Sequence, residues 1–140
     1  MTAVLHAGID AMLEDARSRL VRIDVEPAYR ETLEGALLVD IRPAAQRAAE
    51  GEVHPALRPL VIERNVLEWR LDPGSDACLP QAAHDARILV LCQEGYTSSL
   101  AADSLRSLGL DATDVVGGFR AWREARLPQA CPGASTVVPT

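Results

Sequence analysis

The hydrophobic positions of this chain follow two different periods. Between Ile9 and Leu20 the apolar residues recur every three to four positions with charged residues between them, which predicts an amphipathic helix. Residues 36–41 and 87–92 are instead nearly continuous apolar runs, bounded by glycine, proline or charged residues. Such runs are typical of strands that are buried on both faces, as in a parallel sheet covered by helices.

Weaker patterns predict further elements around these runs. Short strands are predicted at residues 22–24, 60–62 and 114–116. Helices are predicted at residues 26–34, 44–50 and, more weakly, 65–72, then from just after Gly95 to Leu108, and at 119–126. Because helices and strands alternate throughout, the pattern favours an α/β fold with a mostly parallel sheet and helices on both faces. In such folds, ligand sites form at the carboxyl ends of the strands.

The length and the terminal segments indicate one domain. A chain of 140 residues is long enough for a single core. We expect the folded domain to span residues 1–128, with the N-terminal helix packed on it. Residues 129–140 contain two prolines and a glycine but no periodic pattern, and they are expected to form a flexible tail or a strap over the surface.

Composition and charge exclude several functions. The net charge is −6 and every basic residue is Arg, which argues against a nucleic-acid surface and excludes Schiff-base chemistry on a lysine. The sequence shows neither a signal-peptide pattern nor a run of about 18 apolar residues, so we expect a cytoplasmic protein without membrane contact. The three cysteines, Cys78, Cys92 and Cys131, have no CxxC spacing. They predict neither a disulfide framework nor a metal site, and no cofactor is expected.

Cys92 lies where the chemistry is expected, between a buried strand and the helix that follows Gly95. Backbone N–H groups of this loop and the helix dipole can converge on the sulfur and favour an anion there. The thiolate is the form that attacks sulfur donors. Gly95 would let the loop curl through a positive φ, while the hydroxyls of Thr97 and Ser98 are placed to bond the sulfur anion and cap the helix. The alternative interpretation is that Cys92 is a small buried residue at the end of a strand.

Three segments, in this order, resemble the signature of the rhodanese (sulfurtransferase) family. They are Leu38-Val39-Asp40-Ile41-Arg42, then Cys92-Gln93-Glu94-Gly95-Tyr96-Thr97-Ser98, then Gly117-Gly118-Phe119-Arg120-Ala121-Trp122 with Leu127-Pro128. The resemblance covers about residues 24–128. It implies a rhodanese-like three-layer fold with a central, mostly parallel five-stranded sheet. It also implies an enzyme in which a cysteine carries sulfane sulfur as a persulfide.

The resemblance assigns roles to individual residues. Cys92 would be the nucleophile, which takes sulfur from thiosulfate or another small donor, or from a protein persulfide, and passes it to a thiol or cyanide acceptor. The substrate-binding cradle would consist of Gln93, Glu94, Gly95, Tyr96, Thr97 and Ser98. Asp40 and Arg42 match the family's strand-end acid and arginine and are expected to brace the loop. The alternative for this pair is a surface or interdomain salt bridge.

Two segments depart from the family's pattern. Residues 51–56 stand where many members have Gly-His-Ile-Pro-Gly-Ala, so His54 is interpreted as a loop residue. Members that use thiosulfate well often carry Arg or Lys directly after the cysteine, where this chain has Gln93 and Glu94, and thiosulfate is therefore an open choice of donor. Arg47 and Arg64 are candidates to supply the missing positive charge, or are simply solvated.

Two other functions compete with sulfur transfer. Phosphatases and arsenate reductases of related folds need an arginine six positions after the cysteine, and this chain has Ser98 there. A non-enzymatic module that delivers sulfur or senses oxidants would use Cys92 without turnover. In that case Cys78 and Cys131 are candidates to resolve an oxidised Cys92, although spacing cannot show proximity.

Overall fold

The computed structural model of the protein describes residues 8–130. Its centre is a parallel sheet in the order β3-β1-β4-β5, formed by β1 (Leu37–Asp40), β3 (Leu60–Val61), β4 (Arg87–Leu91) and β5 (Asp111–Asp114). The fifth predicted strand, at residues 22–24, is reduced to a single parallel bridge between Ile23 and Val115. This extended stretch is short because Asp24 is already the N-cap of the next helix. The central sheet therefore has four strands where five were expected.

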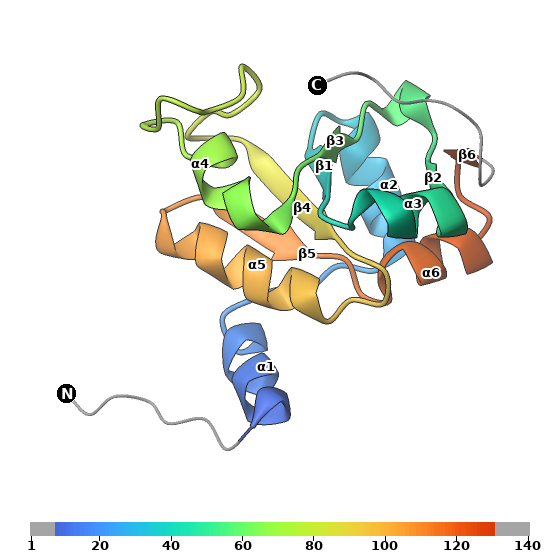
Figure 1. The fold of residues 1–140 in the computed structure, drawn as a ribbon, viewed down its shortest axis with the longest axis horizontal. Coiled ribbons are helices and arrows are strands. Elements are labelled where there is room, and N and C mark those ends of the chain that lie inside the picture. Colours follow the sequence, from blue (N-terminus) through green and yellow to red (C-terminus); the bar gives the residue numbers. More distant parts are fainter. Residues whose placement is uncertain (1–7, 131–140) are drawn as a thin grey trace.

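Helices cover both faces of this sheet, as the alternating pattern predicted (Figure 1). One face carries α4 (Leu67–Leu71) and α5 (Thr97–Ser107), and the other carries α2 (Val25–Leu33) and α6 (Gly118–Glu124). The remaining elements are α1 (Ile9–Arg17), which contacts α5, α3 (Ala44–Glu50), two 3-10 turns at Pro55–Leu57 and Arg64–Val66, and a small antiparallel pair of β2 (Glu52–Val53) with β6 (Gln129–Ala130). The three-layer α/β class is confirmed.

The apolar strands divide the core into two clusters. Ile88, Val90 and Cys92 belong to the cluster under α4 and α5, whereas Leu89 and Leu91 belong to the cluster under α2 and α6. Successive side chains of a strand point to opposite faces, so a strand with a hydrophobic layer on each side must be apolar at every position. This explains the continuous apolar run that ends at Cys92.

One predicted strand boundary was wrong. The strand expected at residues 114–116 is β5, which lies earlier and contains the polar residues Thr113 and Asp114. Both are buried but satisfied, since the Thr113 hydroxyl donates to the carbonyl of Val21 and Asp114 has several partners described below. The first two residues of the predicted tail form β6, which pairs with β2. Residues 131–140 lie outside the described part of the chain.

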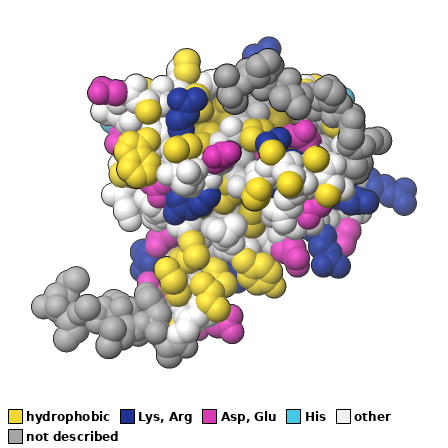
Figure 2. Space-filling model, in the orientation of Figure 1, with side chains coloured by type: hydrophobic (Ala, Val, Ile, Leu, Met, Phe, Trp, Pro, Cys, Tyr) yellow, Lys and Arg dark blue, Asp and Glu magenta, His cyan; other side chains and the backbone are white. Residues whose placement is uncertain are grey.

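Apolar side chains also gather on the surface near the N-terminal helix (Figure 2). Ile9 and Met12 of α1 are 59% and 43% exposed, while Leu13 and Ala16 on its other side are buried. No helix within residues 8–130 is long and apolar enough to span a membrane.

Candidate active site

The two functional segments predicted from the sequence meet at one edge of the sheet. β1 and β4 are neighbouring parallel strands, and Asp40 at the end of β1 is in register with Leu91, the residue before Cys92. The N–H of Ile41 donates to the carbonyl of Leu91 at 3.0 Å, which continues the pairing to the beginning of the loop. Cys92 thus lies at the carboxyl end of a central strand, where α/β folds form their sites.

The loop after β4 curls around the sulfur of Cys92. The N–H of Gly95 donates to Cys92 Sγ at a nitrogen–sulfur distance of 3.2 Å, and Gly95 adopts a φ of +88°. This left-handed conformation is one that residues with a Cβ rarely adopt. Cys92 itself is only 4% exposed. The arrangement gives a sheltered sulfur with a backbone donor beside it, which suits an anionic sulfur species.

The turn before α6 holds the back of this loop. The N–H of Phe119 donates to the carbonyl of Cys92 at 2.8 Å, and the N–H of Arg120 donates to the carbonyl of Gln93 at 3.0 Å. Gly118 makes this close approach feasible, because a Cβ at its position would lie 2.3 Å from the Cys92 carbonyl oxygen. Gly118 of the third signature segment therefore lets the turn before α6 pack closely against the Cys92 loop of the second segment.

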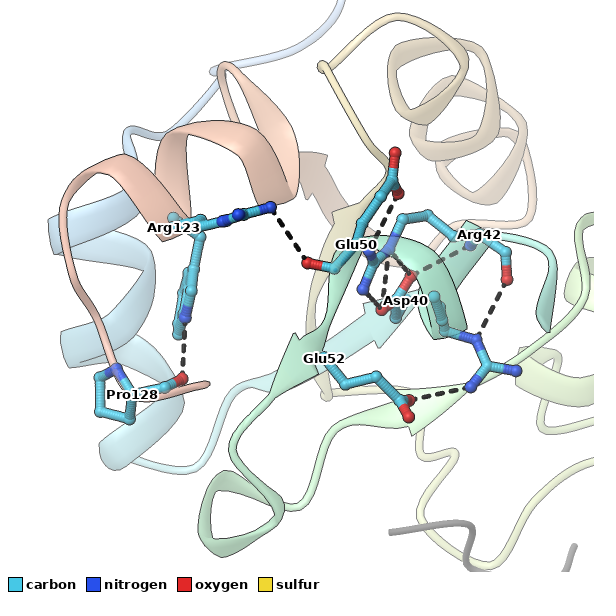
Figure 3. Close-up of polar contacts among 8 residues, drawn as sticks. Asp40, Arg42, Glu50, Glu52, Arg123 and Pro128 are labelled. Atoms are coloured by element: carbon cyan, nitrogen blue, oxygen red, sulfur yellow. Dashed lines mark hydrogen bonds and ion pairs between the residues drawn. The ribbon is translucent and has the colours of Figure 1, made fainter. Parts of the chain in front are cut away.

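Asp40 and Arg42 form a buried ion pair rather than a surface salt bridge (Figure 3). The Arg42 guanidinium donates to both carboxylate oxygens of Asp40, with 2.7 Å for the closest contact, and Asp40 also accepts the backbone N–H of Arg42. The same guanidinium lies 4.1 Å from the centre of the Phe119 ring. The N–H of Phe119 donates to the Cys92 carbonyl, so Asp40 and Arg42 support the Cys92 loop indirectly, through Phe119. Neither Asp40 nor Arg42 forms a hydrogen bond to the loop itself.

The arginines proposed as extra cations are engaged elsewhere. Arg47 pairs with Glu52 at 2.9 Å, within the cluster where Arg42 also pairs with Glu50 (Figure 3). Arg64 pairs with Glu68 on α4 at 2.9 Å. Neither is bonded to the Cys92 loop, so the expectation that they supply charge there is not supported. His54 is an exposed residue that accepts the Ala56 N–H and begins a 3-10 turn, in agreement with its interpretation as a loop residue.

The side chains of the predicted cradle point to different partners. Glu94 is half exposed and lies 3.6 Å from Arg120, and Tyr96 is exposed. The amide oxygen of Gln93 is buried without a hydrogen-bond partner among the described residues. Thr97 is an exposed first residue of α5, whose N-cap is Tyr96, and no side chain caps the helix. The expected cap by Thr97 or Ser98 was therefore wrong.

Ser98 is bonded to a carboxylate instead of the sulfur. Its hydroxyl donates to Asp114 at 2.8 Å, and the hydroxyl of Ser99 donates to the same carboxylate at 2.8 Å. Asp114 is fully buried at the end of β5 and also receives the forked guanidinium of Arg22 at 2.9 and 3.1 Å. A buried carboxylate that attracts the hydroxyls explains why they turn away from Cys92.

Sequence reasoning missed two cations that bind the backbone of the loop. The Arg17 and Arg22 guanidinium groups both donate to the carbonyl of Gly95, at 2.7 and 2.8 Å. Both residues lie more than 70 positions from Gly95 in sequence, outside all three signature segments. The sequence placed Arg22 and Asp114 each as the first residue of a predicted short strand, but no local pattern linked them. Their pairing required the neighbouring positions of Ile23 and Val115.

Residues 8–130 contain no group of three or more His, Cys, Asp or Glu that could hold a metal ion. Cys78 and Cys92 are both free, with Cys78 partly exposed, and Cys131 lies outside the described residues.

Comparison with known proteins identifies the family. The model of the rhodanese-like domain matches residues 11–125, so the chain belongs to the rhodanese-like domain family. An adenylyltransferase and sulfurtransferase of Zea mays, MOCS3-2, is 37% identical over 62 residues, which are 44% of this chain and 13% of that protein. A protein of unknown function from Rhodopseudomonas palustris, described as a possible tyrosine phosphatase, has a similar structure with 29% identity and a TM-score of 0.78. That similarity covers 92% of this chain and 98% of the other.

A second solved structure supports the fold. The polysulfide-sulfur transferase homodimer of Wolinella succinogenes is similar with a TM-score of 0.71 and 22% identity, over 91% of this chain and 90% of that one. At this level of identity the similarity concerns the fold alone. The chain spans only a small part of the curated sulfurtransferases it matches, so their full activities do not transfer with the family.

Proposed function

We propose that the protein is a sulfurtransferase that carries sulfane sulfur as a persulfide on Cys92. The observation that supports this most directly is the Gly95 N–H, which points at the sheltered sulfur at 3.2 Å from a loop held on both sides. Membership of the rhodanese-like domain family and the sulfurtransferase named among its relatives agree with it. The half-buried cradle from Gln93 to Ser98 would then bind the transferred sulfur through its backbone.

The proposed reaction consists of two displacements at sulfur. The Cys92 thiolate attacks the outer sulfur of a donor such as thiosulfate, a new sulfur–sulfur bond forms, and sulfite leaves with the electron pair of the broken bond. An acceptor thiolate or cyanide then attacks the terminal sulfur of the persulfide, and Cys92 leaves again as thiolate. Neither step needs a metal, a redox cofactor or an external oxidant. The Gly95 N–H would stabilise the anionic terminal sulfur between the two steps.

The charged side chains at the exposed rim of the Cys92 loop, Glu94 and Arg120, bear on the choice of donor and acceptor. Glu94 is exposed there and its charge is shared with Arg120, so the rim offers no unpaired cation to a dianion such as thiosulfate. This favours a less charged donor, such as 3-mercaptopyruvate or a protein-bound persulfide. A protein acceptor is a further candidate, because similar domains occur within larger proteins named as adenylyltransferase and sulfurtransferase. A free reactive thiol also fits a reducing compartment, which is the cytoplasm in our proposal.

Phosphatase activity, suggested by the description of the Rhodopseudomonas relative, is poorly supported by this loop. The position six residues after Cys92 is Ser98, whose hydroxyl is bonded to Asp114. Arg17 and Arg22 direct donors to the Gly95 carbonyl from outside the loop. A phosphoryl group would therefore lack the forked arginine that clamps it in such enzymes. We expect no turnover of an aryl phosphate.

Intact mass spectrometry tests the proposal directly. The reduced protein is incubated separately with thiosulfate, 3-mercaptopyruvate and a cysteine-desulfurase persulfide, and its mass is compared with that of Cys92→Ala. We expect the wild-type protein to gain one sulfur atom with at least one donor, the gain to be removed by cyanide, and Cys92→Ala to gain none. Cys78→Ala serves as the matched control and should gain sulfur normally. A gain that persists in Cys92→Ala would disprove the assignment, and no gain with any donor would favour the non-enzymatic module.

A further inference from the structure

Two arginines from outside the signature segments converge on one carbonyl of the Cys92 loop. Arg17 is the last residue of α1, and Arg22 precedes the single bridge of Ile23 with Val115. Their guanidinium groups donate to the Gly95 carbonyl oxygen at 2.7 and 2.8 Å. Arg17 is further held by Ser99, which accepts its Nε–H at 3.0 Å. Segments more than 70 residues apart in sequence thus meet behind the sulfur loop.

The two arginines bind Gly95, the one glycine of the Cys92 loop. Gly95 has neither a side chain nor a preferred sign of φ, so the hydrogen bonds of its backbone groups help to fix its orientation. Its N–H is directed at Cys92 Sγ and its carbonyl at the two guanidinium groups, so both of its peptide groups are anchored. Because a trans peptide unit points its C=O and N–H in opposite directions, the same anchor turns the Tyr96 N–H away from the arginines.

The anchor also brings a net positive charge to the back of the loop. Asp114 is fully buried and neutralises Arg22 through a forked ion pair, while the hydroxyls of Ser98 and Ser99 both donate to its Oδ2. Arg17 has no carboxylate within ion-pair distance among residues 8–130, so its charge is not cancelled locally. The charge of Arg17 polarises the Gly95 carbonyl and lies close to a loop that would hold an anionic sulfur.

We propose that Arg17 and Arg22 are positioning residues for sulfur transfer, and that α1 contributes to the active site through Arg17. They hold Gly95 so that its N–H faces the Cys92 sulfur, and neither of them contacts the substrate. This inference rests on the proposed function, since it assigns a role in the reaction of Cys92.

Arg17 is the better position for a test. Removing Arg22 would leave the buried carboxylate of Asp114 without its cation, and such a variant is expected to fold poorly. Arg17 donates to neutral acceptors, so Arg17→Met removes the contact without stranding a buried charge. The matched control is Arg19→Met, two residues after the end of α1, because Arg19 bridges Asp15 of α1 and Asp103 of α5 and makes no bond to the loop. It removes the same charge and a contact between the same two helices.

The first measurement does not depend on activity. Amide hydrogen exchange followed by nuclear magnetic resonance reports how firmly the Gly95 N–H is held. We expect the Gly95 amide to exchange about ten times faster in Arg17→Met than in the wild-type protein, with Val90 of β4 unchanged. Arg19→Met should leave both amides unchanged. Equal exchange of Gly95 in Arg17→Met and in the wild-type protein would overturn the inference.

The second measurement separates positioning from substrate binding. With the donor that loads Cys92, Arg17→Met should lower kcat about ten-fold and leave KM within two-fold, and Arg17→Lys should recover part of the loss. A rise in KM with unchanged kcat, or an equal loss in Arg19→Met, would overturn the inference. The two proposals fail in different ways: a wild-type protein that takes up no sulfur disproves the proposed function, whereas the exchange experiment still decides whether Arg17 positions the loop.

Discussion

At the scale of single residues, glycines determine how closely the backbone can approach the candidate nucleophile. Gly95 and Gly118 both have positive φ and both lie against neighbouring backbone, whereas Gly109 has a positive φ in open space. A side chain at Gly118 would meet the carbonyl of Cys92 and the backbone of Gln93 within 2.7 Å. The glycine is therefore required by contact as well as by conformation.

This difference leads to a prediction that compares two glycines. Gly118→Ala should lower the free energy of unfolding by about 2–4 kcal/mol and should displace the Cys92 loop, since the added Cβ cannot avoid the backbone. Gly109→Ala, which adds conformational strain without a clash, should cost about 1–2 kcal/mol. Urea unfolding measures both changes. Equal losses in the two variants would show that the close approach at Gly118 is relieved by a small backbone shift.

At the scale of elements, polar contacts tie the helices of one face together. Glu68 on α4 accepts the hydroxyl of Ser104 on α5 and pairs with Arg64 in the turn before α4. Partial burial raises the pKa of Glu68, but the hydrogen bonds from Ser104 and from its own backbone N–H, together with the charge of Arg64, outweigh this effect. The net result is a pKa below the ordinary value of 4.5. The ionised carboxylate thus stabilises the contact of α4 with α5.

The acid stability of the protein should reflect this shift. A carboxyl group whose pKa is lower in the folded state stabilises the fold above its unfolded pKa, and this stabilisation is lost as the pH falls through the folded value. Glu68→Gln should therefore be less stable than the wild-type protein at pH 7, and the difference should shrink as the pH is lowered below 4.5. Thermal unfolding across this range measures the difference. Glu124→Gln, at an exposed ion pair, is the control and should show little change.

At the scale of the whole molecule, the central strand β4 connects the two halves of the core. Its alternate side chains enter the clusters on either face, so both clusters should be lost together when the sheet opens. The Cys92 loop and its supports from α1, α6 and β5 are attached to the carboxyl end of this same strand. The stability of the core and the geometry of the site are thereby coupled.

A core truncation tests this coupling. Leu89→Ala removes a fully buried side chain from β4 and should cost about 2–5 kcal/mol of unfolding free energy. Unfolding should remain a single transition by far-UV circular dichroism and by tryptophan fluorescence, because the two clusters share one sheet. Leu33→Ala, at an exposed position, should change stability by less than about 0.5 kcal/mol. Two separate transitions would contradict a single cooperative core.

Prediction from the sequence succeeded where the signal was local. The apolar runs of β1 and β4 and the helical periods of α1 and α5 are set by which faces of the same segment are buried, so burial can be read from the spacing of their apolar residues. The prediction began β5 too late because the strand starts with the charged Asp111 and contains the polar Thr113, whose burial is compensated by the carbonyl of Val21 far away in the chain. Polar residues of this kind carry no period that would reveal a buried strand.

The amino-acid sequence by itself determined the α/β class, the strand that ends at Cys92 and the loop that follows it, since these depend on short-range patterning and on glycines that accept unusual φ. Only the tertiary structure decided what holds that loop. Arg17 and Arg22 reach Gly95 across 78 and 73 positions, and Asp114 draws Ser98 away from the sulfur. The physical reason is that hydrogen bonds act over about 3 Å in space, and folding alone brings these groups within that range.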